Sequence, residues 1–367
     1  MRRKISLILS LVFCFALAFA FAGLDSANAQ TEQNNRVRQV ASPTPTPITK
    51  TATPAPTAQP TPNPDDEIIK VDTELVNLSV RVIDRNNRPI NNLAQKDFTI
   101  LEDNVAQPIE FFSRAEVPTN YSLVIDNSGS LRQQLEKVIE AGKIITNTNR
   151  ADDETSIIRF VSSDKIEIVQ DFTANKTDIN DALDNLYIEG GQTAIIDAVY
   201  LAAEKVTEYE KKDGSDRKRR ALILVSDGED RDSYYKEQQL FELLRETDVQ
   251  IYVIGFVGDL SKDGGFISKS PQAKAKAFLE KLAVETGGKS YFPESINELT
   301  RIAQDISSEL RTQYSIGYIP TNDRRDGSYR NIKVQVADGP NKQKRIAVTR
   351  AGRTADPEGG KPNLQKN

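Results

Sequence analysis

Residues 122–130 read Ser-Leu-Val-Ile-Asp-Asn-Ser-Gly-Ser, a short apolar run that is followed at once by small polar residues. Three further apolar runs come later in the chain, at 157–161, 221–225 and 249–256. Between these runs, in 131–145 and 195–206, apolar residues recur every three or four positions, which is the period of an amphipathic helix. Continuously apolar strands that alternate with helices predict a doubly wound α/β sheet. We expect one such domain over residues 118–312.

Alternating apolar and polar residues flank this region on both sides and indicate half-buried strands. They occur at 76–82, 98–101, 332–336 and 346–348. Neither flank is long enough to bury a good core alone, but together they match a small β-sandwich of about 90 residues. We therefore predict a sandwich built from residues 67–117 and 313–352, with the α/β domain inserted between its two parts.

Residues 1–29 have the composition of a secretory signal peptide. Basic residues precede the apolar run 5–23, and Ala27 and Ala29 supply small residues before a cleavage site at Gln30. We expect export to the periplasm, the cell surface or the extracellular medium. An apolar run of this length is close to that of a membrane span. The alternative is therefore an uncleaved anchor, the one case in which we expect contact with a membrane.

Residues 30–66 form a predicted Thr/Pro-rich linker, with eight of the chain's 17 prolines between Pro43 and Pro64. Such a segment favours extended polyproline II structure and acts as a semi-rigid spacer. It would hold the folded part away from a surface, or it is a disordered leader without a role, and both readings stay open. Residues 353–367 are polar, and we expect them to form a disordered tail.

The composition of the exported chain restricts its chemistry to oxygen atoms. Without residues 1–29 it has 45 basic and 52 acidic residues, a net charge of −7, which argues against a general nucleic-acid binder. The sequence has no histidine, and its only cysteine, Cys14, lies in the signal segment. A disulfide, a Cys/His zinc site, a cysteine nucleophile and a His-based triad are therefore excluded. Any metal should be a hard cation such as Mg²⁺, Mn²⁺ or Ca²⁺.

Polar side chains follow the strands at one edge of the predicted sheet, where open α/β sheets bind their ligands. One strand ends at Ile125 before a polar loop, and another ends at Val225 before Ser-Asp-Gly-Glu. A glycine-rich loop, 189–193, opens the helix between them. Five oxygen-bearing side chains are predicted to gather here: Asp126, Ser128, Ser130, Thr193 and Asp227.

These five residues resemble the metal-ion-dependent adhesion site of von Willebrand factor type A (VWA) domains. The pattern of that family is D-x-S-x-S, then a threonine after a glycine-rich loop, then an aspartate after a later strand. Segments 97–103 and 310–318 are similar to the flanks of bacterial VWFA-related proteins of acidobacterial type, although Asn104 stands where glycine is expected. The resemblance covers about residues 70–350 and implies a Rossmann-like VWA fold that binds Mg²⁺.

The resemblance also implies a role for each site residue. Ser128 and Ser130 would bind the ion directly, and Asp126 and Asp227 would act through water. Thr193 would join or leave the ligand shell. Because neutral hydroxyls leave a divalent cation poorly neutralised, the ion keeps affinity for one more anionic oxygen. A protein or peptide partner would supply it from an Asp or Glu carboxylate.

Structural roles for the same residues stay open. Ser130 and Thr193 could each cap the helix that follows, and Asp227 could belong to a simple turn. The neighbouring acids are expected to form a solvated rim: Glu229, Asp230 and Asp232. The basic run 211–220 is expected to be a solvated loop. The long loop 258–272 could shape a partner surface or be a tolerated insertion.

The sequence therefore predicts an exported binding protein that is not an enzyme and that captures a ligand carboxylate through Mg²⁺. One alternative is a Mg²⁺-dependent hydrolase or phosphotransferase. Position 128 is serine where a D-x-D loop would have a second aspartate, and no histidine could serve as a base. The other alternative is a structural envelope protein in which the metal only stabilises the fold.

Overall fold

The computed structural model describes residues 75–213, 218–263 and 269–355. The predicted signal peptide, the predicted linker and residues 356–367 of the predicted tail lie outside the described residues. Within the described ranges, no helix is long and apolar enough to cross a membrane.

A six-stranded sheet occupies the middle of the chain, with the strand order β10-β9-β8-β5-β6-β7. Its strands are β5 (Thr119–Asp126), β6 (Glu154–Phe160), β7 (Ile166–Thr173), β8 (Arg219–Ser226), β9 (Val249–Gly255) and β10 (Ser290–Tyr291). Neighbouring strands are parallel except for β7, which pairs antiparallel with β6 at one edge. The parallel strands place their carboxyl ends, and the loops that follow them, at one edge of the sheet.

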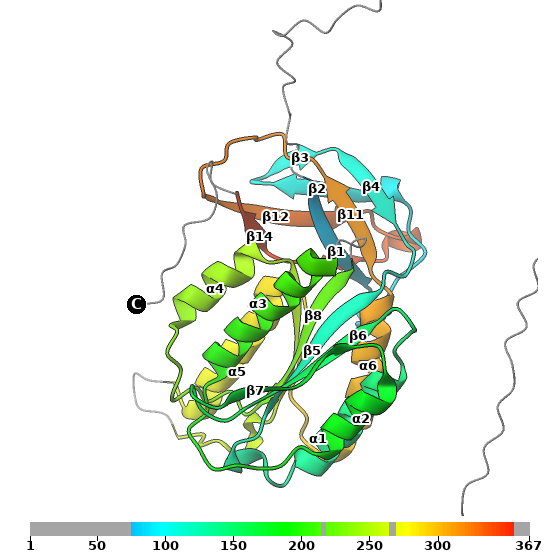
Figure 1. The fold of residues 1–367 in the computed structure, drawn as a ribbon. Helices are drawn as coiled ribbons and strands as arrows, with labels where there is room; N and C mark the ends of the chain where they lie inside the picture. Colours follow the sequence, from blue (N-terminus) through cyan, green and yellow to red (C-terminus); the bar gives the residue numbers. More distant parts are fainter. Residues whose placement is uncertain (1–74, 214–217, 264–268, 356–367) are drawn as a thin grey trace, which may run out of the picture. The chain divides into compact units, whose positions relative to one another are not determined.

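Helices cover both faces of this sheet. They are α1 (Leu135–Asn147), α2 (Lys176–Asp184), α3 (Ile195–Asp213), α4 (Glu237–Glu246), α5 (Pro271–Thr286) and α6 (Leu299–Arg311). Figure 1 shows α3, α4 and α5 on one side of the sheet and α1, α2 and α6 on the other. Short 3₁₀ helices lie at Gln95–Asp97, Gly129–Leu131, Val257–Asp259, Ile296–Glu298 and Pro340–Lys342.

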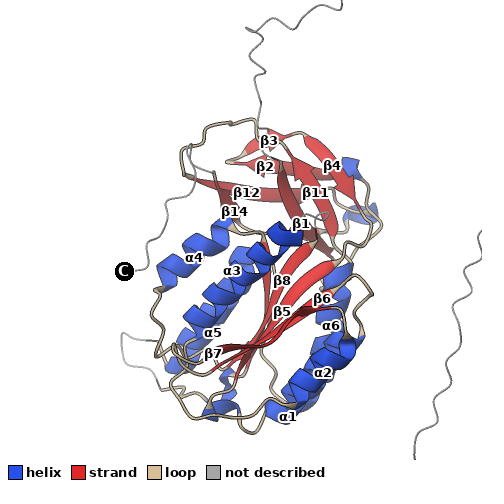
Figure 2. Cartoon of the chain, viewed as in Figure 1, coloured by secondary structure: helices blue, strands red, loops and turns tan. Residues whose placement is uncertain are grey.

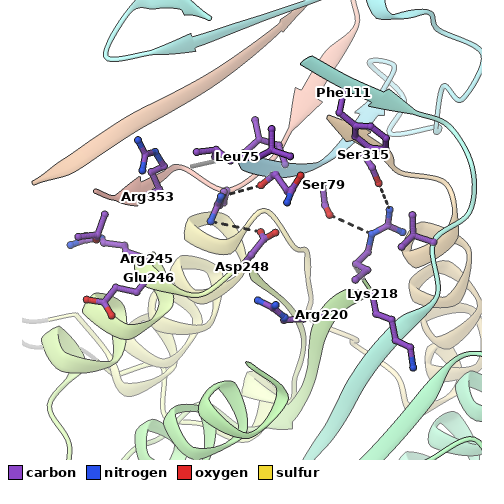
Figure 3. A pocket seen from close by; sticks show the side chains of 17 residues that line it. Leu75, Ser79, Phe111, Lys218, Arg220, Arg245, Glu246, Asp248, Ser315 and Arg353 are labelled. Carbon is purple, nitrogen blue, oxygen red and sulfur yellow. Dashed lines mark hydrogen bonds and ion pairs between the residues drawn. The ribbon is translucent and has the colours of Figure 1, made fainter. Parts of the chain in front are cut away.

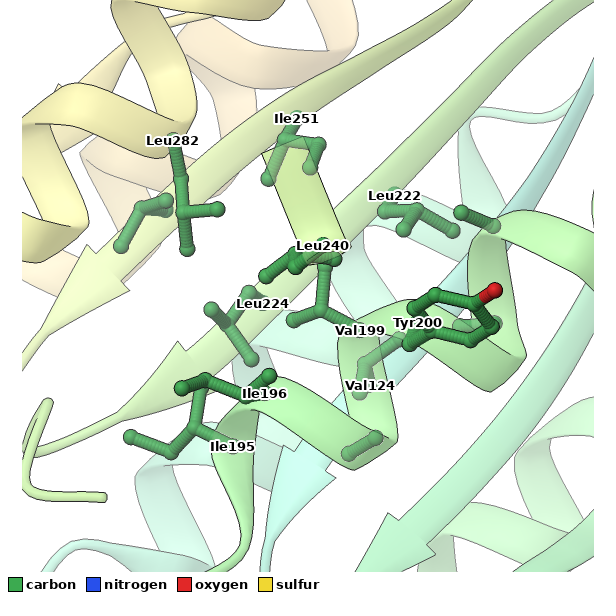
Figure 4. Close-up of a cluster of buried hydrophobic side chains, with 14 of the residues drawn as sticks. Val124, Ile195, Ile196, Val199, Tyr200, Leu222, Leu224, Leu240, Ile251 and Leu282 are labelled. Atoms are coloured by element: carbon green, nitrogen blue, oxygen red, sulfur yellow. The ribbon is translucent and has the colours of Figure 1, made fainter. Parts of the chain in front are cut away.

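Each face of the sheet has its own apolar core, which explains the continuous apolar runs in the sequence. Val124 and Leu224 pack against α3 on one face (Figure 4), and Leu123 and Ile223 face the other core. Successive side chains of a strand point to opposite faces, so a strand covered on both sides is apolar throughout. The prediction of a doubly wound α/β sheet is confirmed.

The strands outside the α/β region form two four-stranded sheets, with the orders β13-β1-β11-β4 and β14-β12-β2-β3. The strands are β1 (Val76–Ile83), β2 (Phe98–Glu102), β3 (Val105–Gln107), β4 (Ile109–Ser113), β11 (Tyr314–Tyr318), β12 (Tyr329–Val336), β13 (Ile346–Val348) and β14 (Gly352–Thr354). Residues of both sheets, among them Leu78 and Ile100, share one apolar core. Figure 2 shows β1 and β2 together with β11 and β12. Because each sheet combines strands from both ends of the chain, the predicted insertion of the α/β domain is confirmed.

Three details differ from the sequence-based expectations. Edge strand β7 was not predicted, because its residues are mostly half-buried or exposed and their pattern is weak. The disordered tail was predicted to start at residue 353, which is too early. Gly352–Thr354 forms a strand that pairs with β12, and Arg353 is 4% exposed. Arg219, from the run 211–220 that was expected to be a solvated loop, begins β8 and is 5% exposed.

The sandwich contacts the amino ends of the α/β strands and the end of α6. Arg81 of β1 forms an ion pair of 2.5 Å with Glu309 of α6, and Lys289 pairs with the same carboxylate at 2.6 Å. Arg219, at the start of β8, donates to the Leu310 carbonyl and to Ser79 Oγ of β1. The sandwich therefore lies at the end of the sheet opposite the carboxyl ends of β5 and β8.

Candidate metal centre

The loop after β5 is organised around the Asp126 carboxylate, which is fully buried. Asp126 Oδ1 accepts the backbone N–H of Ser128 at 2.9 Å, and Oδ2 accepts the hydroxyl of Ser226 at 2.8 Å. Ser128 Oγ then lies 2.9 Å from Ser130 Oγ. Because Ser128 is buried and Ser130 is exposed, this pair of hydroxyls runs from the interior to solvent.

Ser226, the last residue of β8, is a part of this site that the sequence analysis did not assign. Its hydroxyl donates to Asp126 and also accepts the backbone N–H of Gly228 at 3.1 Å. Strands β5 and β8 are parallel with Ile125 opposite Val225, so Asp126 and Ser226 are the next residues along both strands. Had this register been recognised, it would have placed Ser226 of the Ser-Asp-Gly sequence beside Asp126.

Asp227 belongs to a tight turn whose next residue, Gly228, has a backbone conformation that favours glycine. Its Oδ1 accepts the backbone N–H of Glu229 at 3.0 Å, and its side chain is buried. Gly228 has a φ of +84°, and a Cβ atom there would lie 2.8 Å from Leu279 Cδ1 of α5. An L side chain at this position would therefore strain the backbone and displace the turn.

Two sets of hydrogen bonds bring Thr193 to the site. The Nδ2 group of Asn127 donates to the Tyr187 carbonyl at 2.7 Å, and the Asn127 backbone carbonyl accepts the Glu189 N–H at 2.9 Å, which ties the glycine-rich loop to the end of β5. The Thr193 carbonyl accepts the N–H groups of Arg231 and Asp232. Thr193 is buried, and its hydroxyl forms no hydrogen bond with the other four predicted residues in the part of the chain that the structure describes.

Among the described residues, the side chains of Ser130 and Thr193 do not cap the helices that follow them. Gln134 is the N-cap residue of α1, so Ser130 does not cap that helix. At the start of α3, Asp230 Oδ1 accepts the Ile196 N–H at 3.2 Å. Asp227, by contrast, does occupy a turn. The hydroxyls of Ser130 and Thr193 are thus left without a capping function.

The expected solvated rim is more ordered than the sequence suggested. Asp230 also accepts the Ser233 hydroxyl at 2.5 Å, and Asp232 accepts the Ser163 N–H at 3.1 Å. Glu229 forms an ion pair with Arg231. Because all three acids are half-buried and bonded, they support the loop rather than forming a solvated rim.

The buried carboxylates leave negative charge that nearby side chains do not balance. Burial, with a smaller contribution from the charge of Asp227, raises the pKa of Asp126 to about 6, although hydrogen bonds from Ser128 and Ser226 lower it. Among the described residues, neither Asp126 nor Asp227 forms an ion pair with Lys or Arg. No described group of three or more Asp, Glu, His or Cys residues could hold a metal. A cation would therefore depend on the hydroxyls as well, and two carboxylates with three hydroxyls fit a hard divalent ion.

A cavity of about 680 Å³ lies beside this site and was not anticipated. Gly228 and Glu229 line one side, and Lys269, Lys274 and Phe278 line another. Within the described ranges, Lys269 and Lys274 have no ion-pair partner, whereas Glu229 pairs with Arg231. The cavity therefore offers two lysine charges next to the loop that carries Asp227. The loop 258–272, whose role the sequence left open, contributes Lys269 to it.

Comparison with known proteins identifies the α/β region. The model of a family described as the von Willebrand factor type A domain matches residues 122–305, half of the chain. No curated protein matches the sequence.

Solved structures with similar folds share little sequence with this chain. A von Willebrand factor type A protein from Catenulispora acidiphila is 11% identical, with a TM-score of 0.42, over 77% of this chain and 75% of that one. An aerotolerance-related membrane protein from Bacteroides fragilis is 18% identical, with a TM-score of 0.41, over 52% of this chain and 98% of that one. Proximal thread matrix protein 1 from mussel byssus was solved with zinc in its metal-ion-dependent adhesion site (MIDAS) motif. It is 17% identical, with a TM-score of 0.42, over 53% of this chain and 48% of that one.

Proposed function

This chain belongs to the von Willebrand factor type A domain family, and on that basis we propose that it is an exported binding protein that captures a ligand carboxylate through Mg²⁺. One observation carries the proposal. The hydroxyls of Ser128 and Ser130 lie 2.9 Å apart beside the buried Asp126 carboxylate, whose charge no described Lys or Arg balances. This arrangement supports a cation that is held largely by neutral oxygens.

Each residue of the site would contribute differently to holding the ion. Ser128, Ser130 and Thr193 offer neutral oxygens, and Asp126 and Asp227 supply the negative charge. A divalent ion held in this way supplies positive charge that attracts an anionic oxygen from outside the protein. Ser130 is exposed, so a partner's Asp or Glu can approach from that side. The lysines of the neighbouring cavity would favour an acidic partner.

Thermal melts test the metal site. With EDTA and then with added Mg²⁺, we expect a saturable rise in melting temperature, because an ion at 100 times its Kd stabilises by about 2.7 kcal/mol. For a domain of this size the rise is roughly 5–10 °C. Ser130→Ala should reduce it, and Ser308→Ala, which removes an exposed hydroxyl on α6, should not. Equal melting temperatures at millimolar Mg²⁺ and in EDTA would overturn the metal site.

Peptide selection tests the carboxylate ligand. A displayed library of random peptides should be enriched in Asp and Glu with Mg²⁺ and should lose that enrichment in EDTA or with Ser130→Ala. If Mg²⁺ raises the melting temperature but no acidic peptide is enriched, the metal only stabilises the fold. Turnover of p-nitrophenyl phosphate that depends on Ser128 would instead favour the hydrolase alternative.

Export is a separate part of the proposal and rests on residues 1–29. Expression of the full chain in a bacterium with an outer membrane should yield a periplasmic or surface product whose N-terminal residue is Gln30. A product that stays in the membrane and begins at Met1 would support the uncleaved anchor instead.

A further inference from the structure

A second cavity, of about 330 Å³, lies between the sandwich and the amino ends of the α/β strands. Ser79 of β1 and Ser315 of β11 line the sandwich side, and Arg219 and Asp248 line the other, as Figure 3 shows for the labelled residues. This cavity is at the opposite end of the sheet from the metal loop. It is therefore independent of the function proposed above.

The lining of this cavity is strongly cationic. Its charged residues comprise six cations and two acids: Lys218, Arg219, Arg220, Arg245, Arg350, Arg353, Glu246 and Asp248. Carboxylates neutralise several of the cations. Lys218 pairs with Glu154 at 2.7 Å, Arg353 with Glu102 at 3.0 Å, and Arg350 with Asp248 at 3.8 Å.

Arg219 differs from these three cations. The residue is 5% exposed, and among the described residues its guanidinium donates only to neutral oxygens, which are the Leu310 carbonyl and the hydroxyls of Ser79 and Ser315, the last two at 3.4 and 3.5 Å. Among the described residues it has no carboxylate within ion-pair distance. Burial lowers the pKa of this guanidinium, and the more distant charges of Asp248 and Asp153 offset that effect only in part. A buried cation without a counter-charge is costly, and a bound anion would remove that cost.

Further donors and an apolar wall complete the cavity. The Nε atoms of Arg245 and Arg350 are buried and have no hydrogen-bond partner within the described ranges, and Arg245 Nε lies 4.0 Å from the Glu285 carboxylate. Leu75, Phe111 and Val117 line the same cavity, and Phe111 is 43% exposed. The volume is in the range of sites for small organic ligands and exceeds the needs of an inorganic ion.

We propose that this cavity binds a small organic oxyanion, whose phosphoryl or carboxyl head pairs with Arg219 and whose apolar body lies against Phe111 and Val117. Guanidinium groups pair well with both kinds of head group, because their N–H donors match the spacing of two oxygens. The ligand would contact β1 and β11 of the sandwich and β8 of the α/β domain, so its binding should stabilise their contact.

Small aromatic anions test this proposal in the full-length protein. Phenyl phosphate, benzoate, inorganic phosphate and phenol are titrated at constant ionic strength in EDTA, which keeps the metal loop out of the measurement. Isothermal calorimetry and melting temperature should show saturable binding of phenyl phosphate or benzoate with a Kd near or below about 1 mM. Whichever of the two binds more tightly identifies the head group. Inorganic phosphate should bind at least tenfold more weakly, and phenol should not saturate.

Variants locate the binding in the cavity. Arg219→Gln should abolish it, and because this change can also impair folding, Phe111→Ala and Arg350→Gln are measured as well. Phe111→Ala should remove the difference in affinity between phenyl phosphate and inorganic phosphate. Arg350→Gln should weaken the binding of both anions. Arg301→Gln is the control. It removes an arginine on α6 that is 61% exposed, and it should change the affinity for neither anion. The proposal fails if no organic anion saturates, or if binding persists unchanged in Phe111→Ala and Arg350→Gln.

Discussion

Asp126 combines complete burial with a charge that no Lys or Arg in the described part of the chain balances, and this has a measurable consequence for stability. Its pKa is raised from 3.8 to about 6, chiefly by burial. The carboxyl is protonated in both states at low pH, and the unfolded chain releases its proton first as the pH rises. The metal-free fold should therefore lose stability between about pH 4 and pH 6, by about 3 kcal/mol at full effect.

Asp126→Asn should remove this loss, because the amide keeps the shape of the side chain without its charge. Urea denaturation in EDTA measures the free energy of unfolding of the variant and of the wild type at each pH. The difference, variant minus wild type, should rise by about 3 kcal/mol between about pH 4 and pH 7. A constant difference over that range would mean that the carboxylate is balanced in the folded protein. The same variant should lose most of the stabilisation by Mg²⁺.

Gly228 is a second residue whose replacement has a defined effect. Gly228→Ala should lower the free energy of unfolding by about 1–2 kcal/mol, because L residues are strained at positive φ and the new Cβ meets Leu279. It should also weaken stabilisation by Mg²⁺, since the turn that holds Asp227 shifts. Gly190→Ala is the matched control, with no atom within 4 Å of the added Cβ. Equal effects of the two variants, measured by urea denaturation, would contradict this reading.

At the scale of elements, the junction between β1 and α6 depends on one buried carboxylate. Glu309 is 10% exposed at its side chain and pairs with both Arg81 and Lys289. Pairs of this kind stabilise little relative to an apolar contact, but removing one partner leaves a buried charge alone. The position of α6 against the sandwich should therefore be sensitive to the loss of this carboxylate.

Glu309→Gln should lower the free energy of unfolding by about 3–5 kcal/mol, because Arg81 keeps its charge while losing its counter-ion. Glu140→Gln provides the control, since Glu140 forms an exposed pair with Lys137 at 49% and 42% exposure, and such pairs contribute less than about 1 kcal/mol. Denaturation by urea measures both. A loss below about 1 kcal/mol for Glu309→Gln would mean that water reaches the junction.

At the scale of the molecule, the sandwich and the α/β domain depend on each other. Both sheets of the sandwich combine strands from the two ends of the chain, so neither end can form them alone. The α/β domain in turn uses Ser79 and Ser315 as hydrogen-bond partners for buried Arg219. All described residues fall in a single compact unit.

The isolated segment 118–312 should therefore be less stable than the complete protein, because Arg219 and Glu309 lose partners in the sandwich. We expect the complete protein to unfold in one cooperative transition, with fluorescence and circular dichroism giving the same midpoint. The isolated segment should unfold at a lower urea concentration. Two separate transitions in the complete protein would show that the two parts fold independently.

Patterns in the sequence were enough to predict the α/β class, the insertion in the sandwich and the candidate residues of the metal loop. Apolar periodicity identifies buried strands, and parallel strands bring their carboxyl ends to one edge whatever the details of packing. Asp126 and Asp227 could therefore be placed together from strand order alone. The metal-site assignment itself stays a prediction until the ion is measured.

The burial of polar residues and their contacts could not be predicted in the same way, because they depend on how distant segments pack. Arg219 looked like part of a solvated basic loop, yet it is enclosed by Ser79 and Leu310, residues 140 and 91 positions away. Ser226 joined the site through its hydrogen bond to Asp126, 100 positions away. Local sequence records the tendency of a segment to form a strand or a helix. Burial, counter-charge and cavity shape arise from contacts between distant segments, and no local pattern carries them.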